Sequence, residues 1–148
     1  MTGFRRLPVR LGLLAGVALL PLAAGCGKGQ SSSASASQSA AVSEADFAIS
    51  APHHLVAGDV SFRVRNNGPD EHELIIVRTS SGLLPLRSDG VTVNEEALQQ
   101  AEVDSLSPGK PGAVRSLHVR LSPGRYVLLC NMTGHYMGGM HSTLVVTQ

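Results

Sequence analysis

The chain has 148 residues, with 12 Lys and Arg against 11 Asp and Glu, two Cys and no Trp. That length allows one domain of ordinary size. Residues 1–25 hold three of the basic residues and none of the acidic ones, so residues 26–148 are slightly acidic. This balance argues against a nucleic-acid partner, because phosphate binding needs clustered Lys and Arg. Two Cys exclude a disulfide-rich scaffold, and a single long apolar run excludes a multi-pass membrane protein.

The first 25 residues have the features of a secretory leader. A short basic region ends at Arg10, and an apolar run follows over Leu11–Leu22. The run is shorter than the roughly 20 residues that span a bilayer, so we predict a signal peptide over residues 1–25. The pair Arg5 and Arg6 leaves twin-arginine export open beside the general secretory route.

Cys26 directly follows the small residues Ala23-Ala24-Gly25. This segment resembles the lipobox of bacterial lipoproteins, which implies that Cys26 becomes the new N-terminus and carries a diacylglycerol. The alternative is an ordinary signal peptide cut nearby, which leaves Cys26 as a spare thiol. Residues 26–44 are rich in Ser, Ala and Gly without an apolar period, so we predict a lipid-anchored Cys followed by a flexible linker. The leader is thus of the lipoprotein type.

Residues 45–148 have the patterns of one all-β domain. Val60–Arg65 alternates apolar and polar residues, which predicts a strand with one solvent face. His72–Thr79 is β-branched and apolar on both faces, which predicts a buried central strand. Further strands are predicted over Phe47–Ser50, Ser116–Leu121, Arg125–Cys130 and Ser142–Gln148. Six or seven short strands separated by turns favour a β-sandwich.

The long connection Ser80–Gly112 contains the one helical pattern. Asn94–Ala101 begins with a residue that caps helices, and two glutamates follow where a helix N-terminus favours anions. We therefore predict one short helix within an excursion from the sheet.

Metal-binding side chains gather near the C-terminal end of the chain. Cys130 ends an apolar strand, His135 follows five positions later, and Met140 follows five beyond that. Thiolate, imidazole and thioether donors select copper over Mg²⁺ or Ca²⁺, which prefer oxygen. One Cys, two His and a weak axial Met make up a blue-copper ligand set, so a second His is required. Taken singly, a Cys at the end of an apolar strand is more often a buried apolar residue.

His72 is the best candidate for the second His, because it begins the most apolar strand directly after a turn. The remaining histidines are expected to be exposed or hydrogen-bonded locally: His53, His54, His118 and His141. Met132 and Met137 compete with Met140 for the axial position. Glu73 follows His72 directly; a carboxylate there favours Cu(II), unless strand alternation turns it away from the metal.

Two groups of residues resemble a known family. They are Gly58-Asp59-Val60, Asn67-Gly68 and His72-Glu73-Leu74 in the first half of the domain, and Pro123-Gly124-Arg125-Tyr126 with Cys130-x4-His135-x4-Met140 in the second. These motifs are similar to those of cupredoxins, the type 1 copper proteins, and their spacing is most similar to the sulfocyanin and rusticyanin branch. The resemblance covers roughly Phe47–Gln148. It implies a Greek-key β-sandwich that binds one copper ion through His72, Cys130, His135 and Met140.

The resemblance and the leader together predict a membrane-tethered electron carrier and not an enzyme. We expect a monomer, held outside the cytoplasm through Cys26, that passes single electrons between redox partner proteins such as a membrane oxidase or reductase. The alternative is copper delivery or storage. Proteins of that kind usually use exposed Met and His clusters, so Cys130 argues against it. A copper enzyme needs further His ligands, and the chain has no H-x-H pair.

Overall fold

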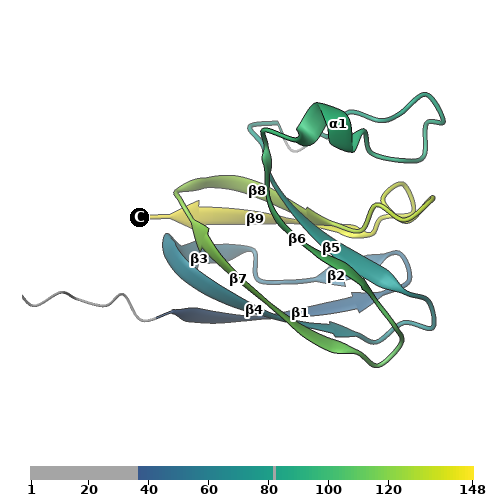
Figure 1. The fold of residues 1–148 in the computed structure, drawn as a ribbon. Helices are drawn as coiled ribbons and strands as arrows, with labels where there is room; N and C mark the ends of the chain where they lie inside the picture. The colour runs from purple at the N-terminus through teal and green to yellow at the C-terminus, as the bar shows by residue number, and fades with distance from the viewer. Residues whose placement is uncertain (1–36, 82) are drawn as a thin grey trace, which may run out of the picture. The chain divides into compact units, whose positions relative to one another are not determined.

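The computed structural model describes residues 37–81 and 83–148, and these form two packed β-sheets (Figure 1). One sheet has the order β2-β1-β4-β7, with β2 at Ala48–Ser50, β1 at Gln38–Ala45, β4 at Gly58–Asn66 and β7 at Val114–Leu121. The other has the order β3-β9-β8-β5-β6, with β3 at His54–Val56, β9 at His141–Thr147, β8 at Gly124–Leu129, β5 at His72–Arg78 and β6 at Glu102–Gly109. The predicted signal peptide and Cys26 lie outside the described residues. Within that described part, no helix is long and apolar enough to cross a membrane.

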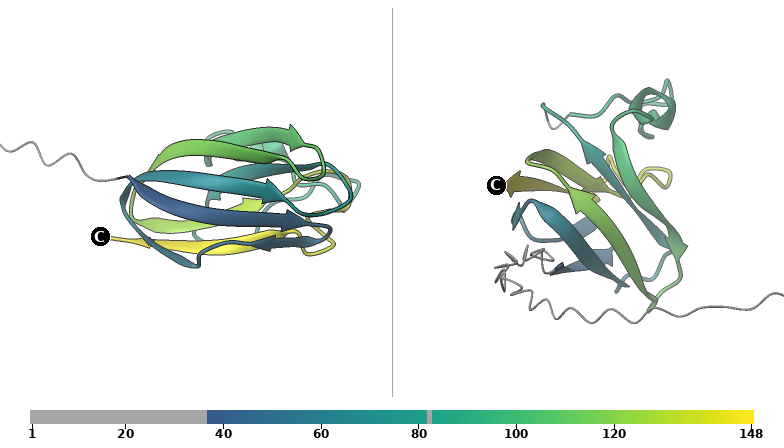
Figure 2. Two further views of the ribbon diagram at one scale, coloured as in Figure 1. Left: turned by 90° about the horizontal axis from the view of Figure 1, so that it is seen from below. Right: turned by 60° about the vertical axis from the view of Figure 1, so that its left-hand side comes forward.

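The chain passes repeatedly between the two sheets, as expected for a Greek-key sandwich. The connections β4 to β5, β6 to β7 and β7 to β8 each leave one sheet and enter the other. Figure 2 shows the two layers from two further directions. The predicted all-β sandwich with one short helix is therefore confirmed.

Alternation along the strands builds the core between the sheets. Val60, Phe62 and Val64 of β4 are buried, as the period-2 pattern predicts. They pack with one face of β5, which contributes Leu74 and Ile76. Each sheet thus turns its apolar face inward.

The long connection covers the outer face of the five-stranded sheet (Figure 1). Ile75 and Val77, on the outward face of β5, pack with Val93 and Leu98 from this connection. This explains why β5 is apolar on both faces. The helix α1 spans Glu95–Leu98 and ends before the predicted Ala101. Its predicted cap is confirmed, because the Asn94 side chain accepts a hydrogen bond from the Ala97 amide at 3.1 Å.

Three strands depart from the sequence prediction. The predicted linker 26–44 is wrong from Gln38 onward, because β1 runs parallel to β4 and buries Ala40 and Val42 against the core. Small residues in this stretch have the composition of a linker, yet their alternation suits a strand once a neighbour is present. The strands β3 and β6 were not predicted. The polar β6 occupies a sheet edge beside β5, and β3 pairs in parallel with β9.

Candidate metal centre

One end of the five-stranded sheet brings the predicted ligands together. His72 is the first residue of β5, and Cys130 directly follows β8. The two strands are antiparallel neighbours, with Ile75 opposite Leu129, so the start of β5 meets the end of β8. His135 lies in the loop between β8 and β9.

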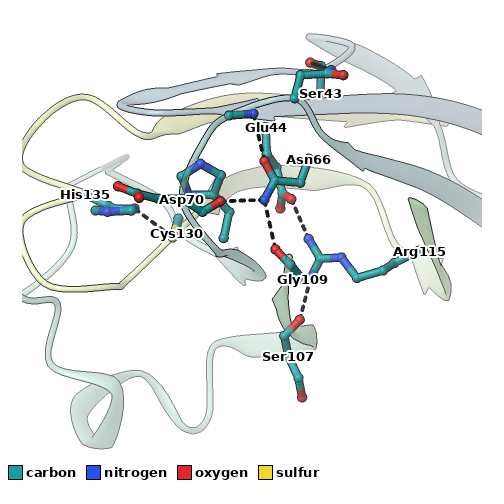
Figure 3. Close-up of polar contacts among 12 residues, drawn as sticks. Ser43, Glu44, Asn66, Asp70, Ser107, Gly109, Arg115, Cys130 and His135 are labelled. Atoms are coloured by element: carbon teal, nitrogen blue, oxygen red, sulfur yellow. Dashed lines mark hydrogen bonds and ion pairs between the residues drawn. The ribbon is translucent and has the colours of Figure 1, made fainter. Parts of the chain in front are cut away.

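Three donor groups form a compact cluster. The ligand atoms of His72, Cys130 and His135 all lie within 4.8 Å of one another. The Cys130 Sγ is 3.5 Å from Nδ1 of His135 (Figure 3), and the rings of His72 and His135 are 5.1 Å apart. Nδ1 of the fully buried His72 has no hydrogen-bond partner. Because burying an unpaired polar group costs free energy, a metal ligated by this imidazole would relieve that cost. The residues therefore fit a thiolate- and imidazole-bound copper ion.

Met140 is fully buried in the same core cluster as Cys130. Backbone hydrogen bonds link Met140 to Cys130 and to His135. The Cys130 amide donates to the Met140 carbonyl at 3.1 Å, and the Met140 amide donates to the His135 carbonyl at 2.9 Å. Met137 is 53% exposed. The structure therefore places Met140 beside the cluster and turns Met137 toward solvent.

The ligand loop is closed by its own backbone. The His135 amide donates to the Met132 carbonyl at 2.8 Å, and the Gly138 amide donates to the Gly134 carbonyl at 2.9 Å. Gly134 has φ of +81°, a conformation that side-chain-bearing residues rarely adopt. These turns fix the backbone of the loop that carries His135.

The surroundings of Cys130 act on its thiol in opposite directions. Burial raises the pKa of Cys130, and backbone N–H groups of Glu73 and Met132 oppose this by hydrogen-bonding the sulfur. A coordinating metal deprotonates such a thiol.

Glu73 also contacts the chain next to Cys130, since its Oε1 accepts a hydrogen bond from the backbone N–H of Asn131 at 3.1 Å. Burial raises the pKa of Glu73 as well. The carboxylate thus holds the backbone next to Cys130.

Asn131 is a site residue that sequence reasoning missed. Its side chain accepts a hydrogen bond from the Val93 amide at 2.7 Å and donates to the Val93 carbonyl at 3.0 Å. It also donates to Glu95 at 2.6 Å. The long connection is therefore bonded to the residue that follows Cys130. The sequence gives one local indication of the contact with Val93, which is that Asn131 directly follows Cys130.

Asn66 organises the turn that delivers His72. Its Nδ2 donates to the Asp70 carbonyl at 2.7 Å and to the Gly109 carbonyl at 2.9 Å (Figure 3). Its Oδ1 accepts from the Gly68 amide at 2.8 Å. The side chain is fully buried. It therefore joins the end of β4, the following turn and β6 at the start of β5.

The turn between β1 and β2 supplies two further neighbours that the sequence did not reveal. Asp46 Oδ1 lies 2.9 Å from Nε2 of His72. The ring of Phe47 packs edge-on to His135, with 5.7 Å between ring centroids. Both residues are distant from the ligands in sequence, so no local pattern could reveal these contacts.

Phe47 packs against the partly exposed His135, and uncharged residues follow His135 in its loop. We call Phe47, Tyr136, Met137 and Gly138 the His135 rim. Phe47 is 54% exposed and Met137 53% exposed. The other histidines lie apart from the cluster, as expected. His53, His54, His118 and His141 are all exposed, and the ring of His141 is tilted against that of Tyr136, with 5.0 Å between centroids.

The comparisons with known proteins agree with this geometry. The model of the sulfocyanin (SoxE) domain matches residues 29–148. The chain belongs to the sulfocyanin family. The predicted resemblance to cupredoxins of the sulfocyanin and rusticyanin branch is thereby confirmed, and copper is the metal that the family and the donor set indicate. No curated protein matches the chain.

Solved structures support the fold of this sulfocyanin-family chain. Dithionite-reduced auracyanin from Roseiflexus castenholzii is 18% identical, with a TM-score of 0.58 over 76% of this chain and 98% of that one. Auracyanin A, a "blue" copper protein from Chloroflexus aurantiacus, is 17% identical, with a TM-score of 0.56 over 74% and 98%. Rusticyanin from Thiobacillus ferrooxidans is 16% identical, with a TM-score of 0.55 over 76% and 79%.

Proposed function

We propose that this sulfocyanin-family protein binds one copper ion through His72, Cys130, His135 and Met140 and carries single electrons between redox partners outside the cytoplasm. The observation that supports it is the compact donor cluster, in which a buried thiol, a buried imidazole whose Nδ1 has no partner and a second imidazole lie within 4.8 Å. Auracyanin A, which shares the fold, is a "blue" copper protein. Bound copper supplies the Cu(I)/Cu(II) couple.

The chain's own contribution is to hold the ligands still. His72 starts a central strand, Cys130 ends its neighbour, and the loop carrying His135 is closed by internal hydrogen bonds. Cu(I) and Cu(II) prefer different geometries, so a site that resists rearrangement lowers the cost of moving an electron. Strand-borne ligands suit that task better than ligands on a loose surface.

The His135 rim is the surface on which a redox partner would dock. It is uncharged and includes the exposed Phe47 and Met137. It adjoins His135, which is partly exposed, whereas His72, Cys130 and Met140 are buried. Electron-transfer pairs use small, transient interfaces, and an apolar ring around a ligand suits brief contact. The partner that we propose is an extracytoplasmic redox protein such as a membrane oxidase or reductase.

A lipid anchor at Cys26 would keep the protein near such a partner. The support is in the sequence, where a basic region, a short apolar run and small residues precede Cys26. Stable anchoring needs two acyl chains, which a diacylglycerol provides. We therefore propose an extracytoplasmic, membrane-tethered monomer.

The first test is the optical spectrum of the full chain loaded with Cu(II), beside that of its Cys130→Ser variant. A thiolate-bound copper gives an intense blue charge-transfer band, so we expect the wild type to show it and the variant to lose it. Cys26→Ser is the matched control, since it removes the other cysteine and should keep the band. A weak spectrum that is unchanged by Cys130→Ser would refute the electron-carrier function and favour copper delivery or storage.

A further inference from the structure

A carboxylate from outside the ligand set touches His72. Asp46 lies in the turn between β1 and β2, and its Oδ1 is 2.9 Å from Nε2 of His72. Both atoms are buried, and neither is aligned in a hydrogen bond with any group. Two buried polar atoms without other partners, at hydrogen-bond distance from each other, are a natural donor and acceptor pair.

Metal binding defines which atom is the donor. A neutral imidazole that ligates a metal through one nitrogen carries its proton on the other. Nε2 of His72 faces Asp46, so Nδ1 is the nitrogen left for copper and Nε2–H is the donor. A carboxylate in that position fixes the ring's orientation and raises its basicity.

Gly68 leaves the space in which this contact forms. A Cβ atom at Gly68 would lie 2.7 Å from both Asp46 Oδ1 and His72 Nε2, closer than real Cβ contacts. The Gly68 amide is held in place by the buried Asn66 side chain at 2.8 Å. The turn before β5 and the turn after β1 are therefore fitted to each other around this pair of atoms.

Two carboxylates act on His72 electrostatically, but Glu44 has its ion pair with Arg115, whereas Asp46 has its ion pair with His72 itself. Glu44 forms an ion pair with Arg115, whose guanidinium also donates to the Ser107 carbonyl (Figure 3). The ion pair found for Asp46 among the described residues is the one with His72. The negative charge of the Asp46 carboxylate therefore acts on the His72 imidazole.

We propose that Asp46 is a positioning residue that holds His72 for copper and stabilises Cu(II) relative to Cu(I). This inference rests on copper binding as proposed above. The carboxylate accepts the Nε2–H bond, orients Nδ1 toward the donor cluster, and increases the electron density that the ring offers to the more highly charged ion.

The test compares Asp46→Ala, Asp46→Asn and Asp70→Asn in the full chain. Asp70 is the matched control, because its exposed carboxylate lies in the turn before His72. We expect Asp46→Ala to weaken Cu(II) binding about 10–100-fold in competition with a chelator, as is typical for lost carboxylate–histidine contacts. The reduction potential then rises by about 59 mV for each tenfold loss of Cu(II) relative to Cu(I).

Two variants separate positioning from a loss of structure. Asp46→Asn keeps an oxygen acceptor, so it should lose less Cu(II) affinity than Asp46→Ala. Gly68→Ala keeps the carboxylate but adds a Cβ that would lie 2.7 Å from both Asp46 Oδ1 and His72 Nε2, so it should force the two atoms apart and raise the potential as Asp46→Ala does. If Asp46→Ala fails to fold, as judged by circular dichroism, these two variants carry the test.

The outcomes distinguish this inference from the proposed function. A blue wild type whose affinity and potential are the same in Asp46→Ala as in Asp70→Asn would overturn the role of Asp46 and leave the copper site standing. A wild type that never becomes blue would overturn both. A selective loss in Asp46→Ala, with an unchanged Asp70→Asn, supports the positioning role.

Discussion

Met140 and Met137 illustrate how burial separates residues of one type near the metal centre. Met140 is fully buried in the core cluster that contains Cys130, whereas Met137 is 53% exposed on the His135 rim. A thioether is a weak axial donor whose identity tunes the copper potential. The chemistry of the two side chains is the same, so only their placement assigns the role.

We expect Met140→Leu to keep the fold and the blue band and to raise the reduction potential. Leu nearly conserves the buried volume, and such swaps usually cost less than about 1.5 kcal/mol. Cu(II) loses a ligand atom, which favours Cu(I). Voltammetry of the loaded protein measures the shift, with Met137→Leu as control. A shift in Met137→Leu, together with an unchanged potential in Met140→Leu, would assign the axial position to the other methionine.

At the scale of elements, β1 and β7 flank β4, and an ion pair ties these two strands to each other. Glu44 of β1 is fully buried and pairs with Arg115 of β7, whose side chain is 16% exposed. A second arginine of β7, Arg120, pairs with Asp59 of β4 in the open, at 72% and 49% exposure. The same strand therefore carries a buried and an exposed example of one interaction.

Substituting each arginine should show how much more the buried ion pair contributes to stability than the exposed one. We expect Arg115→Met to lower the free energy of unfolding by about 3–5 kcal/mol, because it leaves the buried Glu44 carboxylate without its charged partner. Arg120→Met should cost about 0–1 kcal/mol, because water screens an exposed pair. Urea unfolding measures both. Equal small losses in the two variants would show that the buried pair contributes no more than the exposed one.

The pH dependence of Arg115→Met follows from the same carboxyl group. Burial raises the pKa of Glu44, and Arg115 opposes this rise. Without the arginine the folded-state pKa rises further above its unfolded value, so the folded state binds more protons. The variant's stability therefore falls as pH rises from the unfolded pKa through the folded one, and the deficit shrinks on acidification. Unfolding curves at acidic and neutral pH check this sign.

At the scale of the whole molecule, the two cysteines are expected to serve separate purposes. Cys130 lies in the donor cluster with His72 and His135, and Cys26 lies in the lipobox-like segment outside the described residues. We expect Cys26→Ser to move the protein from the membrane fraction to the soluble fraction with its blue band intact. Cys130→Ser should stay with the membrane and lose the band. Fractionation followed by absorption spectroscopy tests both, and a wild type found entirely in the soluble fraction would contradict the anchor.

Local periodicity and residue spacing were enough to predict several features of this protein. Alternation identified β4, an apolar run identified β5, and a capping Asn identified the start of α1. The donor types of Cys130, His135 and Met140 indicated copper, and their spacing allowed one strand end and one short loop to bring them together. His72 followed from its position at the start of an apolar strand.

Features that depend on neighbours distant in sequence became evident in the folded chain. β1 is a strand because β4 pairs with its small residues, which by composition alone resemble a linker. Glu73 faces the Asn131 amide, Asn131 bonds to Val93, and Asp46 touches His72. Each contact joins segments far apart along the chain, and folding brings them together through burial and hydrogen bonding that no local pattern encodes.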